Sequence, residues 1–196
     1  MLINSPTERE DPRTTRTRKL IIDAFMEILG GKGFQNLTVQ DIAESAGVHR
    51  GTFYSHFPDK YALLAFSIQQ NFQQEIEKRM LNDSTYSEKN LRDLIVVVCE
   101  FISHAHGLRA HSEQQFALLV EAQVKKQSQE IIQKWLDEAG SGIEPERAAI
   151  SASWGMYGLA LQWNRDKRKT KISADQFADE IFPLIVPKIC ITSENG

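Results

Sequence analysis

The chain has 196 residues, of which 41% are hydrophobic and 25% are charged, and its formal net charge is −3. Such a composition is ordinary for a soluble globular protein, and the length allows a buried core without disulfide staples. The net charge lacks the basic excess that is typical of a nucleic-acid-binding domain.

The charges are distributed unevenly along the chain. Residues 12–60 carry seven basic and five acidic side chains, a net charge of +2, whereas residues 61–196 carry 15 basic and 18 acidic side chains, a net charge of −3. A mildly basic N-terminal part on an acidic remainder is typical of a DNA-binding protein whose body stays off the phosphates.

The chain begins with a polar segment, residues 1–12, which we expect to be a flexible tail. It contains no apolar stretch of the signal-peptide kind, and no apolar run in the chain approaches the ~18 residues that span a bilayer. We therefore expect a cytoplasmic protein with no membrane partner.

The first helix is expected at about residues 15–29, where apolar residues recur at helical spacing, and the glycines at 30, 31 and 33 are expected to end it.

Two short helices follow in close succession. Thr38-Val39-Gln40-Asp41 is similar to a capping box and predicts the start of a helix at Thr38. The turn Ala46-Gly47-Val48 ends that helix, because glycine tolerates the left-handed backbone that a tight turn requires. A further helix is expected at about residues 50–57, ending before Pro58. Two short helices joined by a tight turn are the helix-turn-helix arrangement.

The rest of the chain also predicts helices. We expect them near residues 59–81, 88–106, 111–126, 128–139, 145–165 and 173–190, with a loop at the polar run 165–171. Pro183 and Pro187 are expected to kink or end the last helix. No stretch alternates as a strand would, so the predicted fold class is all-α.

The stretch from Gly33 to Leu64 resembles the signature of the TetR family of bacterial transcriptional regulators. The matching positions are Gly33-Phe34, Thr38, Ile42-Ala43, Ala46-Gly47-Val48, Gly51, Phe53-Tyr54, His56-Phe57, Lys60 and Leu63-Leu64. The likeness covers roughly residues 15–65, and the remainder matches the family only in length and helical character. The resemblance implies an N-terminal three-helix helix-turn-helix DNA-binding domain at residues 13–60 and a helical effector-binding and dimerisation domain at residues 61–196.

Helix-turn-helix geometry and this resemblance together indicate the DNA-binding residues. Arg50 opens the recognition helix and is expected to bind a guanine edge in the major groove, while Thr52 is expected to contact a thymine methyl or a phosphate. Tyr54, His56 and Lys60 match positions that bind phosphates in the family. The expected DNA-binding residues are Thr38, His49, Arg50, Gly51, Thr52, Tyr54, His56 and Lys60.

Each of these assignments has a structural alternative. Arg50 is otherwise a solvated surface arginine. His56 is otherwise a packing or capping histidine, and Tyr54 a half-buried aromatic with its hydroxyl in water. Thr38 is expected both to cap its helix and to touch a phosphate.

Residues near the C-terminus are candidates for a dimer interface. The resemblance implies that the last two helices form a four-helix bundle with those of a second copy, and a two-fold pair of readers recognises two half-sites. The alternative is that the same helix faces pack within one chain. The predicted interface residues are Ala148, Ala152, Gly155, Leu159, Phe177, Ile181, Leu184 and Ile185.

The resemblance also implies a pocket for a small-molecule effector. Its candidate lining residues are Phe101, His104, Phe116, Trp154, Tyr157 and Trp163, although aromatic residues at helical spacing more often belong to a core. His104, His106 and His111 do not predict a metal site, because His104 and His106 point to different helix faces and no further ligands complete the set. We expect no metal and no cofactor.

These observations favour a ligand-responsive transcriptional repressor. It would bind double-stranded DNA at a palindromic operator as a homodimer and be released by a small molecule. One alternative is a constitutive DNA-binding or nucleoid-type protein without an effector switch, and another is a catalytic or carrier protein with a vestigial DNA reader. We expect no enzyme, because the sequence has no phosphate-binding glycine loop, nucleophile elbow, HExxH or CxxC motif.

Overall fold

A computed structural model describes residues 12–79, 85–107, 114–140 and 144–186. In these ranges every regular element is a helix, which confirms the predicted all-α class. The internal contacts divide the chain into one unit that ends at Leu63 and a second unit that begins at Leu64. The expected N-terminal tail lies outside the described residues except for Pro12, with which the first helix begins.

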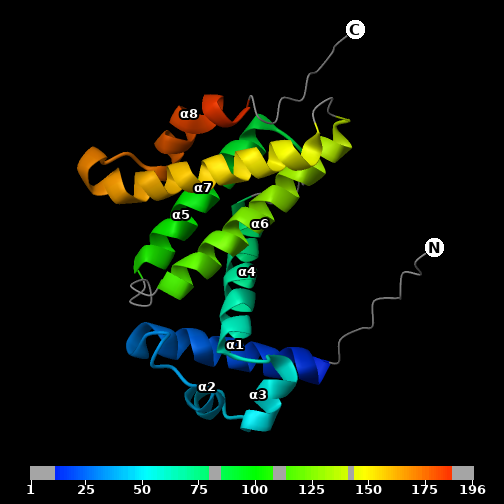
Figure 1. Cartoon of the computed structure of the whole chain (residues 1–196), viewed down its shortest axis with the longest axis vertical. Helices are drawn as coiled ribbons and strands as arrows, with labels where there is room; N and C mark the ends of the chain where they lie inside the picture. Colours follow the sequence, from blue (N-terminus) through cyan, green and yellow to red (C-terminus); the bar gives the residue numbers. More distant parts are fainter. Residues whose placement is uncertain (1–11, 80–84, 108–113, 141–143, 187–196) are drawn as a thin grey trace, which may run out of the picture. The chain divides into compact units, whose positions relative to one another are not determined.

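The first unit contains α1 (Pro12–Lys32), α2 (Val39–Ser45), α3 (Arg50–His56) and the first turn of α4, coloured blue to cyan in Figure 1. Its core is aromatic and aliphatic, and Phe34 packs edge-on against Phe25 with 6.4 Å between the ring centroids. These contacts fix the helices to one another, since helices as short as α2 and α3, with seven residues each, are not stable alone. The core residues with no exposed surface are Ile21, Phe25, Phe34, Leu37, Ile42, Phe53 and Leu63.

α1 is longer than the sequence suggested. It continues through Gly30 and Gly31 to Lys32, so the prediction that these two glycines end the helix is wrong. Gly33 is the residue with a left-handed backbone, at φ 73°, and its N–H donates to the Leu29 carbonyl at 3.1 Å. The chain therefore turns where the backbone leaves the helical region rather than at the first glycine.

The turn between α2 and α3 is the predicted one. Gly47 has a φ of 65°, and the N–H of Val48 donates to the Ala43 carbonyl at 2.9 Å. A side chain at position 47 would be strained in this conformation. The turn is thus formed by Gly47 and by several backbone hydrogen bonds, which include that from the Gly47 N–H to the Glu44 carbonyl at 3.1 Å.

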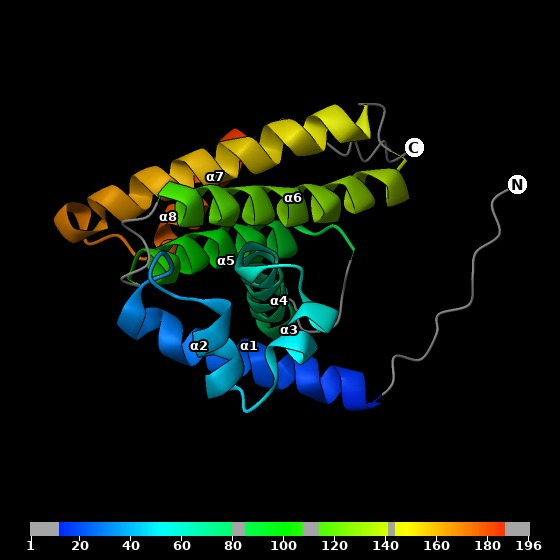
Figure 2. The same ribbon diagram turned by 60° about the horizontal axis from the view of Figure 1, so that its bottom comes forward.

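The second unit contains the rest of α4 (Lys60–Arg79) with α5 (Glu88–Gly107), α6 (Gln114–Glu138), α7 (Pro145–Thr170) and α8 (Ala174–Ile185). Figures 1 and 2 both show α7 alongside α6, and α7 also contacts α5 and α8. The core between these helices is dense in aliphatic side chains. Its fully buried members include Phe72, Leu91, Leu94, Val124, Ile132, Trp135, Ala149, Ala152 and Ala160.

Two predictions for this unit are wrong. The expected separate helices at 111–126 and 128–139 are one continuous helix, α6, since 114–138 contains no glycine or proline and its buried face runs unbroken. The polar run expected as a loop at 165–171 is instead helical to Thr170. Lysine and arginine are good helix formers and are favoured near a helix C-terminus, and the chain turns only at Lys171, at φ 57°.

α8 begins with a capping box and ends soon after a proline. The Ser173 hydroxyl accepts from the Gln176 N–H at 3.2 Å, and the Gln176 side chain accepts from the Ser173 N–H at 3.0 Å. The helix contains Pro183 and continues to Ile185, so it does not end at that proline. Residues 187–190, which were expected to continue this helix and include Pro187, lie outside the described residues.

The helices of the described ranges include none that is long and apolar enough to cross a membrane.

The Cys99 thiol is fully buried in α5, and burial, together with the charge of Glu100, raises its pKa to about 12. This thiol therefore stays protonated near neutral pH and is a packing group rather than a nucleophile.

Candidate nucleic-acid interface

The start of α2 is fixed by a network around Thr38. The Thr38 hydroxyl accepts from the Asp41 N–H at 3.1 Å, and the Asp41 carboxylate accepts from the Thr38 N–H at 3.0 Å, so the predicted capping box is confirmed. The Lys32 ammonium reaches the same carboxylate at 2.6 Å. The carboxylate thus sits at the positive end of α2 and is held there from α1.

This network predicts a pH dependence of stability. The hydrogen bond from Lys32, followed by those from Thr38, lowers the Asp41 pKa from 3.8 to about 2. A carboxyl group with a depressed pKa in the folded state stabilises the fold above its unfolded pKa, and that stabilisation is lost as pH falls through the folded pKa. Between pH 4 and pH 2 the thermal unfolding midpoint of the wild type should therefore fall more than that of Asp41→Asn. Parallel curves in circular dichroism melts would contradict this.

The start of α3 has one face packed into the core and one face exposed to solvent. Phe53 is fully buried and packs edge-on against the Tyr54 ring at 5.6 Å, while His49, Arg50, Gly51 and Tyr54 are exposed. The Arg50 guanidinium lies 5.9 Å from the Tyr54 ring centroid and donates to the Tyr54 hydroxyl at 3.4 Å. The buried phenylalanine anchors the helix so that an arginine and a tyrosine project together from its outer face.

The other predicted residues of α3 are less exposed. Thr52 is half-buried, and its carbonyl accepts from the Ser55 hydroxyl at 2.7 Å. His56 is half-buried at the end of α3, and its Nδ1 atom is buried without a hydrogen-bond partner. His49 occupies the N-cap position of α3 but makes no side-chain cap bond, so its imidazole is not committed to the helix terminus.

Lys60, the first residue of α4, is engaged within the first unit. Its ammonium donates to the carbonyls of Phe34, Gln35 and Leu37 at 2.9, 3.1 and 2.8 Å. An ammonium has three N–H donors, and this arrangement uses all three. Nothing in the sequence indicated these contacts, because they join positions 23 to 26 residues apart.

The predicted effector-pocket residues are spread over different environments. Phe116 and Trp163 are buried, and Trp163 donates to the Ile172 carbonyl at 3.0 Å, as expected for core aromatics. Phe101 is half-buried and packs edge-on against Phe72 at 5.1 Å. His104 and Trp154 are exposed, and Tyr157 is half-buried.

Trp154 carries a cation on its face. The Lys125 ammonium lies 3.6 Å from the Trp154 ring centroid and 5.7 Å from that of Tyr157, and it pairs with Glu121 at 2.6 Å. Burial and the charge of Glu121 raise the Tyr157 pKa to about 12, so this phenol is neutral near pH 7. These contacts join α6 to α7.

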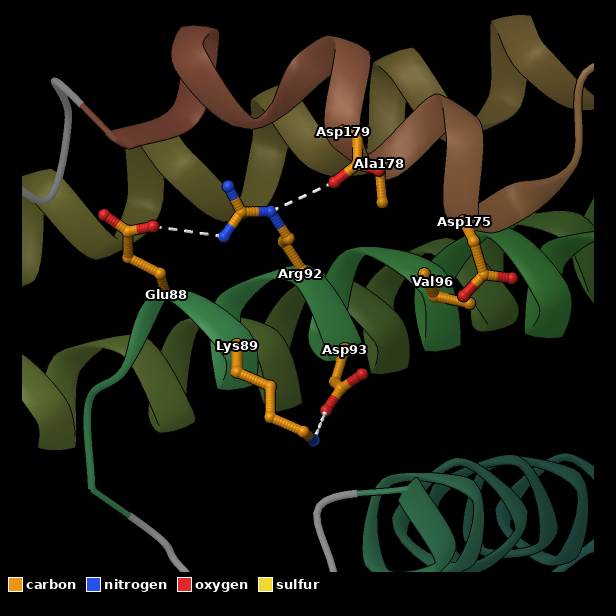
Figure 3. Close-up of a pocket in the computed structure, with 8 residues that line it drawn as sticks. All are labelled: Glu88, Lys89, Arg92, Asp93, Val96, Asp175, Ala178 and Asp179. Atoms are coloured by element: carbon orange, nitrogen blue, oxygen red, sulfur yellow. Dashed lines mark hydrogen bonds and ion pairs between the residues drawn. The ribbon is translucent and has the colours of Figure 1, made fainter.

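A surface groove of about 460 Å³ lies between α5 and α8, and none of the predicted effector residues lines it (Figure 3). Arg92 spans it, pairing with Glu88 at 3.2 Å and Asp179 at 3.1 Å, and Lys89 pairs with Asp93. The groove is therefore lined by paired charges, of which the Arg92–Asp179 pair joins α5 to α8. Its lining residues are Glu88, Lys89, Arg92, Asp93, Val96, Asp175, Ala178 and Asp179.

The predicted interface residues divide into two groups. Ala148, Ala152, Ile181 and Ile185 are buried within this chain, which is the alternative that the sequence left open. A β-carbon on Gly155 would lie 3.5 Å from the Ile185 side chain, so that close contact joins α7 to α8 internally. Leu159 and Phe177 are half-buried, and Leu184 is exposed.

A pair of polar groups that the sequence did not single out lies inside the second unit. Gln127 and Ser128 on α6 are 5% and 1% exposed, and neither the Gln127 Nε2 atom nor the Ser128 hydroxyl has a hydrogen-bond partner.

Where side chains are described, no group of three or more His, Cys, Asp or Glu residues is arranged to hold a metal ion. His111 and the side chain of His106 fall outside that part of the chain.

Known proteins resemble this chain in sequence and in fold. The family model for bacterial regulatory proteins of the tetR family matches residues 21–65. YxbF of Bacillus subtilis, an uncharacterised HTH-type transcriptional regulator, is 29% identical over 107 residues, which span 50% of this chain and 28% of YxbF. The HTH-type transcriptional activator FasR of Mycolicibacterium smegmatis is 28% identical over 175 residues, or 83% of this chain and 79% of FasR.

A solved structure shares the fold over most of the chain. The transcriptional regulator FadR from Bacillus subtilis, in complex with stearoyl-CoA, superposes with a TM-score of 0.56 at 20% sequence identity and covers 87% of this chain and 98% of FadR. The matched family segment contains the capped start of α2, the Gly47 turn and the exposed start of α3. Residues 21–65 thus carry a helix-turn-helix segment similar to that of the tetR family of bacterial regulatory proteins, and the chain as a whole shares its fold with a regulator of transcription.

Proposed function

We propose that the protein is a homodimeric, ligand-responsive transcriptional repressor that binds a palindromic operator and is released from it by a small molecule. The observation that carries the proposal is the first turn of α3, where Arg50 and Tyr54 project from a helix anchored by the buried Phe53. Recognition helices read base edges in the major groove with residues of their N-terminal turns.

The DNA contacts follow from the exposed side chains. Arg50 has a planar fork of donors that suits the O6 and N7 acceptors of guanine, and in the free protein only its weak, 3.4 Å contact with Tyr54 must be given up. His49 and Gly51 allow close approach of the helix start, and Thr52 reaches a base methyl or a phosphate. Thr38, Tyr54 and His56 hold phosphates on either side and so fix the register of the reader.

A second copy of the chain is proposed to dock on the exposed face of α7 and α8. Trp154 on α7 and Leu184 on α8 are 60% and 58% exposed, and Ile150 and Gly158 are also exposed on α7. Large apolar side chains exposed on adjacent helices favour a protein interface. These exposed residues, and not the buried Ala148, Ala152, Ile181 and Ile185, are therefore proposed as the centre of the interface.

The effector is proposed to bind within the second unit beside Gln127 and Ser128. A buried polar group without a partner costs about 1–3 kcal/mol, so such groups are rare in native proteins and require an explanation. The two side chains share a helix face with the fully buried Val124 and Ile132. A largely apolar molecule with a hydrogen-bond acceptor, such as a carbonyl or carboxylate oxygen, would satisfy the Gln127 amide there.

Substitution of these two residues tests the effector proposal. Gln127→Leu with Ser128→Ala should leave the free energy of unfolding of the free protein unchanged or raise it, because no hydrogen bond is lost. A compound screen by thermal shift, including stearoyl-CoA (the ligand in the FadR structure), should give smaller shifts with this variant than with wild type. Gln129→Leu on the same helix is the control. Equal shifts in all three proteins would exclude this site.

Selection from a random-sequence duplex pool tests the DNA-binding function. We expect the wild-type chain to enrich an inverted repeat whose half-sites lie about 34–36 Å apart, since a two-fold dimer presents two recognition helices at that spacing. Enrichment of a single half-site would contradict the dimer, and no enrichment would favour a nucleoid-type protein. In vitro transcription from a promoter that overlaps the selected site distinguishes repression from the activation indicated by the name of FasR.

A further inference from the structure

Lys60 joins the first turn of α4 to the turn that precedes α2. The ammonium lies at 2.8–3.1 Å from three carbonyl oxygens, those of Phe34, Gln35 and Leu37. It also lies 4.8 Å from the Phe34 ring centroid and 5.8 Å from that of Tyr61. Phe34 is fully buried and packs edge-on against Tyr61 at 5.1 Å, so the cation sits between two fixed rings and three fixed acceptors.

The three carbonyl acceptors belong to residues 34–37, the segment that directly precedes Thr38. Leu37 donates its N–H to the Phe34 carbonyl at 3.3 Å, which closes the turn, and Thr38 follows as the N-cap of α2. Thr38 is exposed, and its hydroxyl both accepts from the Asp41 N–H at 3.1 Å and donates to the Asp41 carboxylate at 2.8 Å. The orientation of this hydroxyl therefore depends on where residues 34–37 are held.

The chemistry of the Lys60 ammonium suits it to holding the 34–37 turn and leaves no donor for a phosphate. Its three N–H donors are all engaged, and binding a phosphate would require it to release at least one carbonyl. Three acceptors converging on one point suit a compact ammonium, whereas a planar guanidinium directs its donors outward in a fork. An arginine at this position would thus keep the charge but not the hydrogen bonds.

We propose that Lys60 is a positioning residue for the DNA interface, which acts by holding the 34–37 turn and through it Thr38, the N-cap residue at the exposed start of α2, and that it does not itself contact DNA. This inference rests on the proposed DNA-binding function. It separates two roles that a lysine at the start of α4 can have, and the two roles predict opposite results for a charge-preserving substitution.

The test compares Lys60→Arg with Lys60→Met in fluorescence anisotropy, using the duplex that the wild type enriches from a random pool. A positioning role predicts that both variants bind roughly tenfold or more weakly, since the charge-assisted hydrogen bonds are lost in each. It also predicts that the slope of log affinity against log salt stays at the wild-type value. Near-wild-type binding by Lys60→Arg, with a slope reduced by about one in Lys60→Met, would overturn the proposal and indicate a phosphate contact.

A double-mutant cycle separates positioning from general destabilisation. Thr38→Val should weaken binding in the wild-type background and add little in Lys60→Met, because the capped start of α2 is already displaced in that variant. Thr38→Ser, which keeps the hydroxyl, is the matched control in both backgrounds. Fully multiplicative losses from Thr38→Val and Lys60→Met would contradict action through Thr38.

NMR of the lysine Nζ–H₃⁺ groups of the wild-type protein decides the matter without any substitution. We expect the Lys60 signal to be protected from exchange in the free protein and to keep its shift when the enriched duplex is added. Loss of protection, or a new coupling to a phosphate, would overturn the proposal. If no duplex is enriched, the DNA-binding function fails, while the free-protein spectrum still tests the three carbonyl bonds on which the inference depends.

Discussion

Arg50→Ala should lose most of the discrimination between the selected operator and a scrambled duplex. A bidentate arginine–guanine pair is worth about 1–3 kcal/mol, so each half-site should lose roughly 5- to 150-fold in specific affinity. The loss should be complete at this position because Arg50 is exposed at the start of α3, with no neighbouring cation to replace it on that helix. Anisotropy titrations against the two duplexes measure the ratio directly.

A matched control is available in the second unit. Arg147 on α7 is an arginine whose side chain is 83% exposed, paired with Glu144 at 2.7 Å. Arg147→Ala removes the same charge from the protein and should leave discrimination unchanged. If Arg50→Ala kept the wild-type ratio between operator and scrambled duplex, the assignment of α3 as the base-reading helix would be wrong.

Leu184→Glu should convert the proposed dimer to a monomer. A carboxylate placed in the centre of an apolar interface must be desolvated twice, once in each copy, and has no partner there. A monomer presents one reader, so operator affinity should fall by about 100-fold or more as the second half-site ceases to contribute. Sedimentation velocity should show a species of 22.3 kDa in place of one twice that mass.

The control for this substitution lies on a helix outside the proposed interface. Leu118 on α6 is 57% exposed, close to the exposure of Leu184, so Leu118→Glu places a carboxylate at an equally exposed position. It should remain dimeric. Trp154→Glu should behave as Leu184→Glu does, although it also removes the ring beneath Lys125. Dissociation by Leu118→Glu, with Leu184→Glu still dimeric, would move the interface from α7 and α8 to α6.

The N-terminal motif could be predicted from the sequence because its determinants are local. The Thr38 capping box acts over three residues, and Gly47 acts at its own backbone position. The end of α1 was misplaced because Gly30 and Gly31 are tolerated inside a helix whose other face is buried. Propensity is a weak guide where tertiary packing decides.

Whether a given residue belongs to the core, to an interface or to a binding site could not be predicted, because that depends on contacts between segments that are distant in the sequence. The sequence pattern marks Ala152 and Ile185 as interface candidates, yet they are buried against this chain's own helices, whereas Leu184, one position away, is exposed. The three carbonyls that meet Lys60 and the unpartnered atoms of Gln127 and Ser128 are likewise visible only in the folded chain.

The central claim is that this chain reads a specific DNA sequence. The most direct test is to measure the affinity of the wild-type protein for the selected duplex and for a scrambled duplex of the same length across a salt series. We predict that affinity for both falls steeply with salt and that the selected duplex is bound at least roughly 10³-fold more tightly throughout. Equal affinity for the two duplexes at every salt concentration would contradict the claim and leave only a sequence-independent DNA-binding protein.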